Sequence, residues 1–143
     1  MSGAAEDRDW TLLFLAWLLA AGATAGSLFF SSVMGLTPCV LCWYQRIFLF
    51  PLVVVLARGL FPLDLGAVKY AWPLVAGGLL TAAYHNLLYL GLVPKDLQPC
   101  GKGVSCTDEG MALFGFVSIP LLSLLAFAAL AALLFALSRR NAR

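Results

Sequence analysis

Residues 10–45, WTLLFLAWLLAAGATAGSLFFSSVMGLTPCVLCWYQ, contain no charged side chain. A membrane-spanning helix needs about 20 mostly apolar residues, so this stretch is too long for one span and has to contain a turn. Gly35, Thr37 and Pro38 provide residues that favour a turn near its end. The stretch therefore predicts two membrane-spanning helices that are joined by a tight connection.

The composition of the whole chain agrees with a membrane protein. Of its 143 residues, 62% are hydrophobic and only 11% are charged, which is far fewer charges than a soluble domain carries. The sequence predicts an all-α membrane protein, a four-helix transmembrane bundle that forms a single domain over residues 1–143. The expected spans are approximately residues 10–30, 41–60, 70–93 and 110–137.

The positions of lysine and arginine predict the orientation, because these residues are enriched on the cytoplasmic side. With four spans, the N-terminus, the middle loop and the C-terminus share one side. That side holds Arg8, Arg58, Lys69, Arg139, Arg140 and Arg143, and the other side holds Arg46, Lys95 and Lys102. We therefore expect both termini in the cytoplasm and the other two loops outside it.

All four cysteines lie in the two loops that this orientation places outside the cytoplasm, where disulfides persist. Cys39 and Cys42 form a Cys-x-x-Cys pair at the expected start of the second helix. Unpaired backbone N–H groups and the helix dipole at such a start favour a thiolate, the reactive form of cysteine. Cys100 and Cys106 form a second pair, in the loop between the third and fourth spans.

Three interpretations are open for these cysteines: two structural disulfides, a four-cysteine zinc site, or a relay of thiol–disulfide exchange. Closing the small loop between Cys100 and Cys106 contributes only about 2 kcal/mol in the chain-entropy description, so stabilisation is a weak explanation. An oxidising compartment disfavours the free thiolates that zinc requires. The relay is therefore the leading hypothesis, and a non-enzymatic membrane scaffold with structural disulfides or zinc is the alternative.

A relay needs a final electron acceptor, and the sequence contains neither a Gly-rich nucleotide-binding motif nor a haem-attachment motif. A lipid-soluble quinone that reaches Cys42 from within the bilayer is the remaining candidate. Arg46 lies one helical turn after Cys42 and could bind the quinone or stabilise the thiolate. It could equally be an anchor that extends its charge to the lipid headgroups.

His85 and Pro120 are the other unusual residues of the expected spans. A histidine at membrane depth usually faces the bundle interior, and His85 could donate to the quinone or simply bond to a neighbouring helix through a Ser or Thr hydroxyl. Pro120 predicts a kink in the fourth span, and the carbonyl that it frees needs a donor from a neighbour.

Several motifs together resemble one known family. The segment at 38–46, Pro-Cys-Val-Leu-Cys-Trp-Tyr-Gln-Arg, closely resembles the signature of the DsbB/BdbC family of bacterial membrane disulfide-bond formation proteins. The other matching residues are Tyr84-His85, Pro99-Cys100, Val104-Ser105-Cys106 and the segment 115–120, Gly-Phe-Val-Ser-Ile-Pro. The loop that carries the second cysteine pair is compact, as in the BdbC-like branch.

This resemblance implies a quinone-dependent protein-disulfide oxidoreductase (a thiol oxidase) in the bacterial cytoplasmic (inner) membrane. Its partner would be an extracytoplasmic thioredoxin-fold thiol oxidase, DsbA-like or BdbD-like, and its electron acceptor would be ubiquinone or menaquinone from the membrane pool. The resemblance implies no nucleic-acid partner, and the surroundings of the spans would be membrane lipid.

The resemblance also assigns roles to individual residues. Cys100 would be attacked by the partner's thiolate, and Cys106 would be its pair. Cys39 would exchange with this second pair, while Cys42 would face the quinone as a thiolate. The family's quinone-site residues match Arg46 and His85 of this chain.

Overall fold

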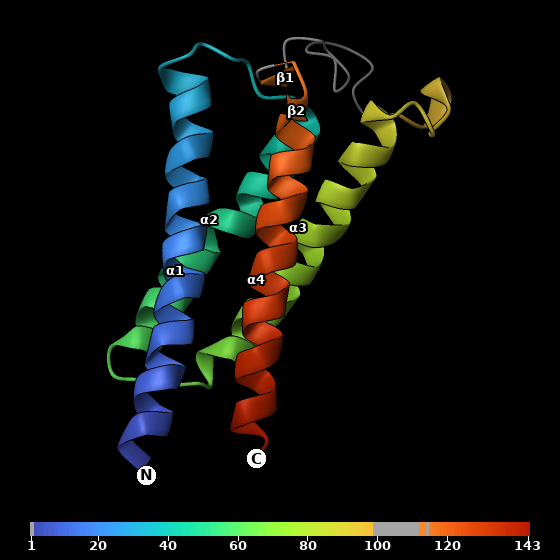
Figure 1. Cartoon of the computed structure of the whole chain (residues 1–143). Coiled ribbons are helices and arrows are strands. Elements are labelled where there is room, and N and C mark those ends of the chain that lie inside the picture. The colour runs from blue at the N-terminus through green and yellow to red at the C-terminus, as the bar shows by residue number, and fades with distance from the viewer. Residues whose placement is uncertain (1, 99–111, 114) are drawn as a thin grey trace.

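The computed structural model describes residues 2–98, 112–113 and 115–143. Cys100 and Cys106, with the roles expected of them, lie outside the described residues. The described part is dominated by long helices (Figure 1). The helices are α1 (Ser2–Ser32), α2 (Val40–Leu60), α3 (Ala67–Tyr89) and α4 (Ile119–Asn141), with a short 3₁₀ helix η1 (Lys95–Leu97) and two short antiparallel strands, β1 (Ala112–Leu113) and β2 (Val117–Ser118).

Within the described residues, three helices are long and apolar enough to cross a membrane: Gly3–Ser32, Val40–Leu60 and Ile119–Asn141. Helix α3 has 23 residues, which at 1.5 Å per residue is also long enough. It carries Lys69 near its start and His85 and Asn86 in its second half, and it lacks a stretch as apolar as the candidate spans of the other three helices. The chain is thus a membrane protein whose less apolar third helix lies among three strongly apolar ones.

The four long helices form a bundle in which α2 packs against α1 and α3, and α4 packs against α3 and α1. Both termini and the connection from α2 to α3 lie at one end of this bundle (Figure 1). The connection from α1 to α2 and the paired strands lie at the opposite end. This arrangement places the start of α2, and with it the Cys-x-x-Cys pair, at the end away from the termini.

The core contains aliphatic side chains from every long helix, including the fully buried Leu13, Leu56, Val75 and Leu134. Small residues let the helices approach closely, as is common between membrane helices. A Cβ atom at Gly78 of α3 would lie 2.1 Å from Cε1 of Phe127 on α4. Helix α3 is therefore packed tightly against α4.

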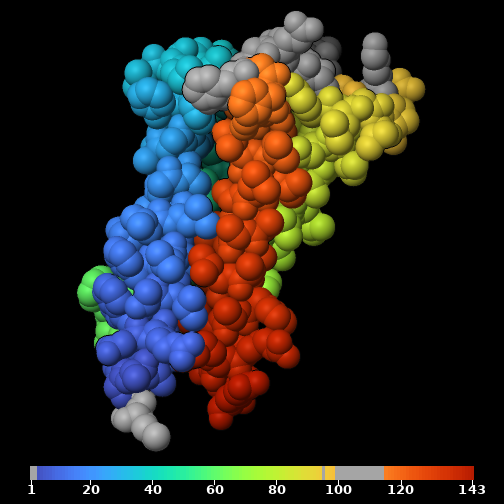
Figure 2. Space-filling view, viewed as in Figure 1, coloured from blue at the N-terminus to red at the C-terminus, as the bar shows by residue number. Residues whose placement is uncertain are grey.

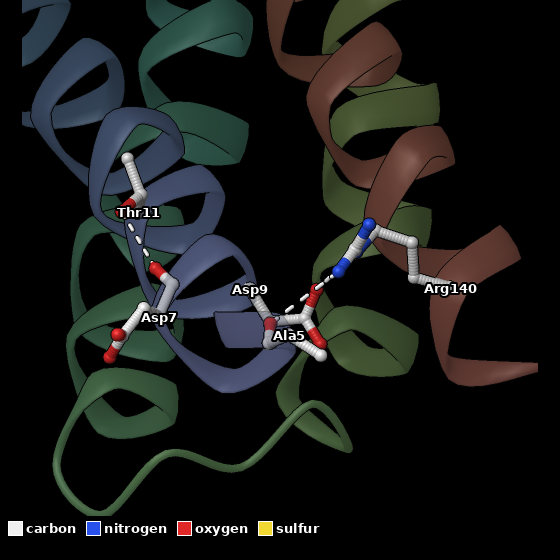
Figure 3. Close-up of polar contacts among 5 residues, drawn as sticks. All are labelled: Ala5, Asp7, Asp9, Thr11 and Arg140. Atoms are coloured by element: carbon white, nitrogen blue, oxygen red, sulfur yellow. Dashed lines mark hydrogen bonds and ion pairs between the residues drawn. The ribbon is translucent and has the colours of Figure 1, made fainter. Parts of the chain in front are cut away.

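The ends of α1 and α4 are joined by polar contacts (Figure 3). The Arg140 side chain forms an ion pair with Asp9 and also donates to the backbone carbonyl of Ala5 at 3.4 Å. Within α1, the Thr11 hydroxyl donates to the carbonyl of Asp7 at 2.7 Å. These contacts hold the first turns of α1 beside the last turn of α4.

The start of α4 differs from the expected fourth span. The helix begins at Ile119 instead of near residue 110, after the short strand β2. The Ser118 hydroxyl accepts a hydrogen bond from the Leu121 backbone N–H, and Pro120 lies in the first turn. Because the first turn does not use its N–H groups, proline fits there without distortion. The expected kink at Pro120 was wrong.

The carbonyl of Pro120 itself accepts hydrogen bonds from two side chains. The Asn86 side-chain amide of α3 donates to it at 2.7 Å, and the Ser123 hydroxyl donates at 2.8 Å. The Asn86 bond fastens the beginning of α4 to the second half of α3, close to the end of the bundle that carries the cysteine pair.

Candidate redox site

The Cys-x-x-Cys pair lies at the first turn of α2. Cys39 is the residue immediately before the helix, with extended backbone, and Cys42 lies within the first turn. Both are free thiols, and their Sγ atoms are 3.2 Å apart. Cys39 is 2% exposed, whereas Cys42 is partly exposed. The two sulfurs are therefore close enough to form a disulfide and differ in their access to the surroundings.

Cys39 precedes the apolar helix and has an environment that favours its thiolate. A hydrogen bond from the Cys42 thiol lowers the pKa of Cys39 below its ordinary value, and contact with His85 lowers it further. Burial of Cys39 opposes both effects, because it disfavours the charged form. The net result is a lowered pKa, so the buried sulfur of the pair favours the form that carries out thiol–disulfide exchange.

His85 approaches the pair from α3. Its side chain is fully buried, and its Nε2 atom lies 3.8 Å from Cys39 Sγ. Its Nδ1 atom lies 3.2 Å from the side-chain nitrogen of Gln45 on α2. His85 therefore contacts the side-chain amide of a neighbouring helix, and the sulfur that it contacts is that of Cys39.

Arg46 extends toward α1. Its Nε atom donates to the Ser27 hydroxyl, and its Nη2 atom donates to the Ser27 carbonyl, both at 2.7 Å. The guanidinium also lies 5.2 Å from the centre of the Trp43 ring, a cation–π distance. Arg46 is only 8% exposed, so its charge is held inside the protein instead of extending to the headgroups. Because both acceptors are neutral, this site keeps a positive charge near Cys42.

A large groove runs between α1, α2 and α4, and Figure 2 shows the hollow between the upper halves of α1 and α4. Its volume is about 1200 Å³, slightly above that of common small-molecule sites. Cys42, Gln45 and Arg46 line it from α2, and most of the remaining lining is aliphatic. Cys42 and Arg46 thus share one cavity, whereas Cys39 and His85 lie outside its lining.

The pair and the histidine could also hold a metal ion. The Sγ atoms of Cys39 and Cys42 and a ring nitrogen of His85 all lie within 4.8 Å of one another. Thiolate sulfur and imidazole nitrogen are the ligands that zinc prefers. Such a site would exist only in the dithiol form, because a disulfide offers no thiolate.

Comparison with known proteins identifies the family. Residues 8–137 match the sequence model of the family described as disulfide bond formation protein DsbB. The chain belongs to the DsbB family. As in other DsbB-family proteins, its role is that of a protein-disulfide oxidoreductase in disulfide bond formation, and this family is linked in general to quinones.

Curated DsbB-family relatives match over most of their length. A probable disulfide formation protein of Metapseudomonas resinovorans is 48% identical over 137 residues, which are 95% of each chain. Disulfide bond formation protein C of Bacillus subtilis is 38% identical over 80% of this chain and 83% of the relative. The resemblance to the DsbB/BdbC family is thereby confirmed. No solved structure matches this chain.

Sequence reasoning placed Cys39, Cys42 and Arg46 near one another but missed two polar residues of this DsbB-family site. Ser27 binds Arg46, and Gln45 binds His85. Both are polar residues within the charge-free stretch, and that could have drawn attention to them. Their partners were not predictable, because each partner lies on another helix.

Proposed function

We propose that this protein is a quinone-dependent thiol oxidase that reoxidises an extracytoplasmic thioredoxin-fold partner, DsbA-like or BdbD-like. The observation that carries the proposal is the shared groove: Cys42 and Arg46 both line it, so a redox-active sulfur and a buried cation face the same cavity. Membership of the DsbB family supports the same reaction class.

The groove suits a quinone in both shape and chemistry. Apolar residues of α1 and α4, such as Leu15, Leu18 and Leu125, would accommodate a prenyl tail. At the α2 side of the groove, Arg46 and Gln45 offer hydrogen-bond donors suited to the carbonyl oxygens of the ring. A bound ubiquinone or menaquinone would supply a two-electron, two-proton acceptor.

The cysteines divide the proposed reaction between them. The partner's thiolate attacks Cys100 of a Cys100–Cys106 disulfide and releases Cys106 as a thiolate. The partner's second thiolate then attacks the mixed disulfide and releases Cys100, so the partner is oxidised and Cys100 and Cys106 are left as a dithiol. That dithiol then reduces the disulfide between Cys39 and Cys42 through exchange at Cys39. Cys42 gives up electrons on the groove side, the two thiols lose two protons and two electrons in total, and their disulfide is restored.

Arg46 would stabilise negative charge in this scheme. Its guanidinium stabilises negative charge that develops near Cys42 or on an oxygen of the bound ring, because a charge at a buried site is weakly screened. Ser27 fixes the guanidinium through two hydrogen bonds, one to its hydroxyl and one to its carbonyl. His85 lies against Cys39, so its support for quinone chemistry would act through the sulfur pair.

The proposed location is the bacterial cytoplasmic membrane, with all four long helices crossing it. Among the described residues, three helices are apolar enough to cross, and the bundle's antiparallel order supports a crossing by α3 as well. The excess of Lys and Arg at the end that holds both termini supports a cytoplasmic position for that end. The pair Cys39 and Cys42 would then lie at the extracytoplasmic end of the bundle, on the same side of the membrane as the proposed partner.

A zinc-binding membrane scaffold is the second candidate, and the three ligand atoms of Cys39, Cys42 and His85 are what favours it. The two candidates differ in the reactivity of the pair. A redox-active pair equilibrates rapidly with a mild dithiol and needs no metal, whereas a scaffold contains bound zinc and its sulfurs do not cycle.

Arg46→Ala tests the quinone site, and Arg58→Ala is a matched control at the other end of the same helix. Arg58 donates to the carbonyl of Phe61, away from the groove. Loss of a charged hydrogen bond is worth about 1.5–3 kcal/mol, so the apparent KM for a soluble quinone analogue should rise roughly tenfold or more in Arg46→Ala. Reduction of the protein by a dithiol donor should stay normal. An unchanged quinone KM in Arg46→Ala would overturn the assignment.

A further inference from the structure

Three buried side chains form a continuous chain of contacts that begins at the groove and leads away from it. Gln45 of α2 lines the groove and contacts His85 of α3, and His85 contacts Cys39; their exposed fractions are 7%, 0% and 2% respectively. The proposed function gives roles to Cys39 and, as a donor to the quinone ring, to Gln45, but none to the contact between Gln45 and His85. A buried polar side chain needs its hydrogen bonds satisfied, and the one recorded for Gln45 goes to His85.

The contact between Gln45 and His85 favours one of the two neutral tautomers of the ring. The Gln45 side-chain nitrogen can only donate, so Nδ1 of His85 has to accept. In a neutral imidazole the proton then lies on Nε2, the atom 3.8 Å from Cys39 Sγ. Hydrogen bonds to sulfur are long, and at this distance the Nε2–H group can donate to the sulfur.

We infer that Gln45 is a positioning residue that holds His85 in the tautomer that donates to the Cys39 sulfur, and so stabilises the reduced form of the pair. Two-electron reduction of the Cys39–Cys42 disulfide produces two sulfurs that can each bear a negative charge or bind a proton. A donor aimed at Cys39 favours the state in which this sulfur keeps the charge. The pair then becomes easier to reduce and a stronger oxidant.

This inference rests on the proposed function only in requiring that the pair cycles between disulfide and dithiol. The other charged or titratable groups described near His85 have contacts of their own. Cys42 lies beside Cys39, and Arg46 extends to Ser27 on α1. Among the described residues, α1 carries no charge over 10–32, and α4 carries none over 119–138. The Tyr84 hydroxyl of α3 donates to the carbonyl of Leu97.

The test is the redox equilibrium of the first pair, measured anaerobically in glutathione buffers with the free thiols trapped by alkylation. The background is the full chain with Cys100→Ser and Cys106→Ser, so that only one pair is titrated. Gln45→Leu removes the amide, and Thr81→Val is a control one helical turn before His85 whose hydroxyl donates within α3. We expect Gln45→Leu to reduce the equilibrium constant for reduction about tenfold, which is about 30 mV. Thr81→Val should match the parent.

Gln45→Glu tests the tautomer itself, because a carboxylate can only accept a hydrogen bond, so Nδ1 of the neutral ring has to donate to it. Nε2 then carries no proton and no longer donates to Cys39. We therefore expect Gln45→Glu to lower the equilibrium constant for reduction at least as far as Gln45→Leu does.

Three results would overturn the inference. One is an unchanged equilibrium constant in Gln45→Leu, and another is an equal change in Thr81→Val. The third is an equilibrium constant in Gln45→Glu equal to that of the parent. If the leucine variant does not fold, as judged by thermal unfolding in detergent, the equilibrium constant of the glutamate variant decides the matter. Neither quinone nor the partner takes part in this equilibrium, so its failure is distinct from failure of the proposed function.

Discussion

Gly78→Ala tests whether the close contact between α3 and α4 sets the position of the Phe127 ring at the groove. The added Cβ would lie 2.1 Å from Cε1 and 2.4 Å from Cζ of Phe127. Carbon atoms prefer separations of about 3.5–4.0 Å, so the ring or the helix has to move by more than about 1 Å. Phe127 is 2% exposed and lines the groove. A displaced Phe127 ring would therefore move into the groove.

Overpacking of this kind costs about 1–3 kcal/mol, and we expect the upper end because the contact is so short and so buried. Thermal unfolding in detergent should show the loss, and the apparent KM for a quinone analogue should rise as the ring enters the groove. Phe127→Leu shortens the obstructing side chain, so Gly78→Ala should cost less in that background. Gly22→Ala is the matched control for the stability measurement, because a Cβ at Gly22 meets nothing within 4 Å. A Gly78→Ala protein as stable as the parent would refute the packing argument.

Three further predictions concern other parts of the molecule. Asn86→Leu removes the bond to the Pro120 carbonyl and should lower the stability by about 0.6–2 kcal/mol in thermal unfolding, with no loss expected if the bond contributes nothing. In the reduced protein, the lowered pKa of Cys39 should keep thiolate absorbance in the ultraviolet as the pH falls below the ordinary thiol range, and Cys39→Ser should lose this signal. Chelator treatment should leave quinone reduction unchanged, whereas stoichiometric zinc in the purified protein together with lost activity would favour the scaffold.

The charge-free stretch predicted α2 and the end of α1 closely, because turn residues and length limit where a span can lie, whereas α1 begins at Ser2 instead of near residue 10. The second helix was expected over residues 41–60 and is found at Val40–Leu60. The start of α4 was less predictable from apolar composition, since residues 112–118 are as apolar as the helix that follows. The Ser118-Ile119-Pro120 sequence did contain the needed signal, a hydroxyl cap with proline in the first turn. A proline is read as a kink only if the helix already extends before it, and here the helix begins beside Pro120.

The site was partly predictable for a related reason. Cys42 and Arg46 are four residues apart on one helix, so they lie on the same face of it. Their position in one cavity could therefore be expected from the sequence spacing alone. The contacts of His85 with Cys39 and Gln45 join helices that are far apart in the sequence. No local pattern indicates which face of α3 meets which turn of α2, and the packing of the bundle decides it.

The central claim is that electrons pass from Cys39 and Cys42 to a quinone, and a single-turnover experiment tests it most directly. The full chain, reduced and freed of excess reductant, is mixed with a soluble quinone analogue under strictly anaerobic conditions. Quinone absorbance and the thiols of each pair are followed together. We predict one quinone reduced for each disulfide formed, with this reaction lost in Cys42→Ser. Quinone that is not consumed while Cys39 and Cys42 remain reduced would contradict the account.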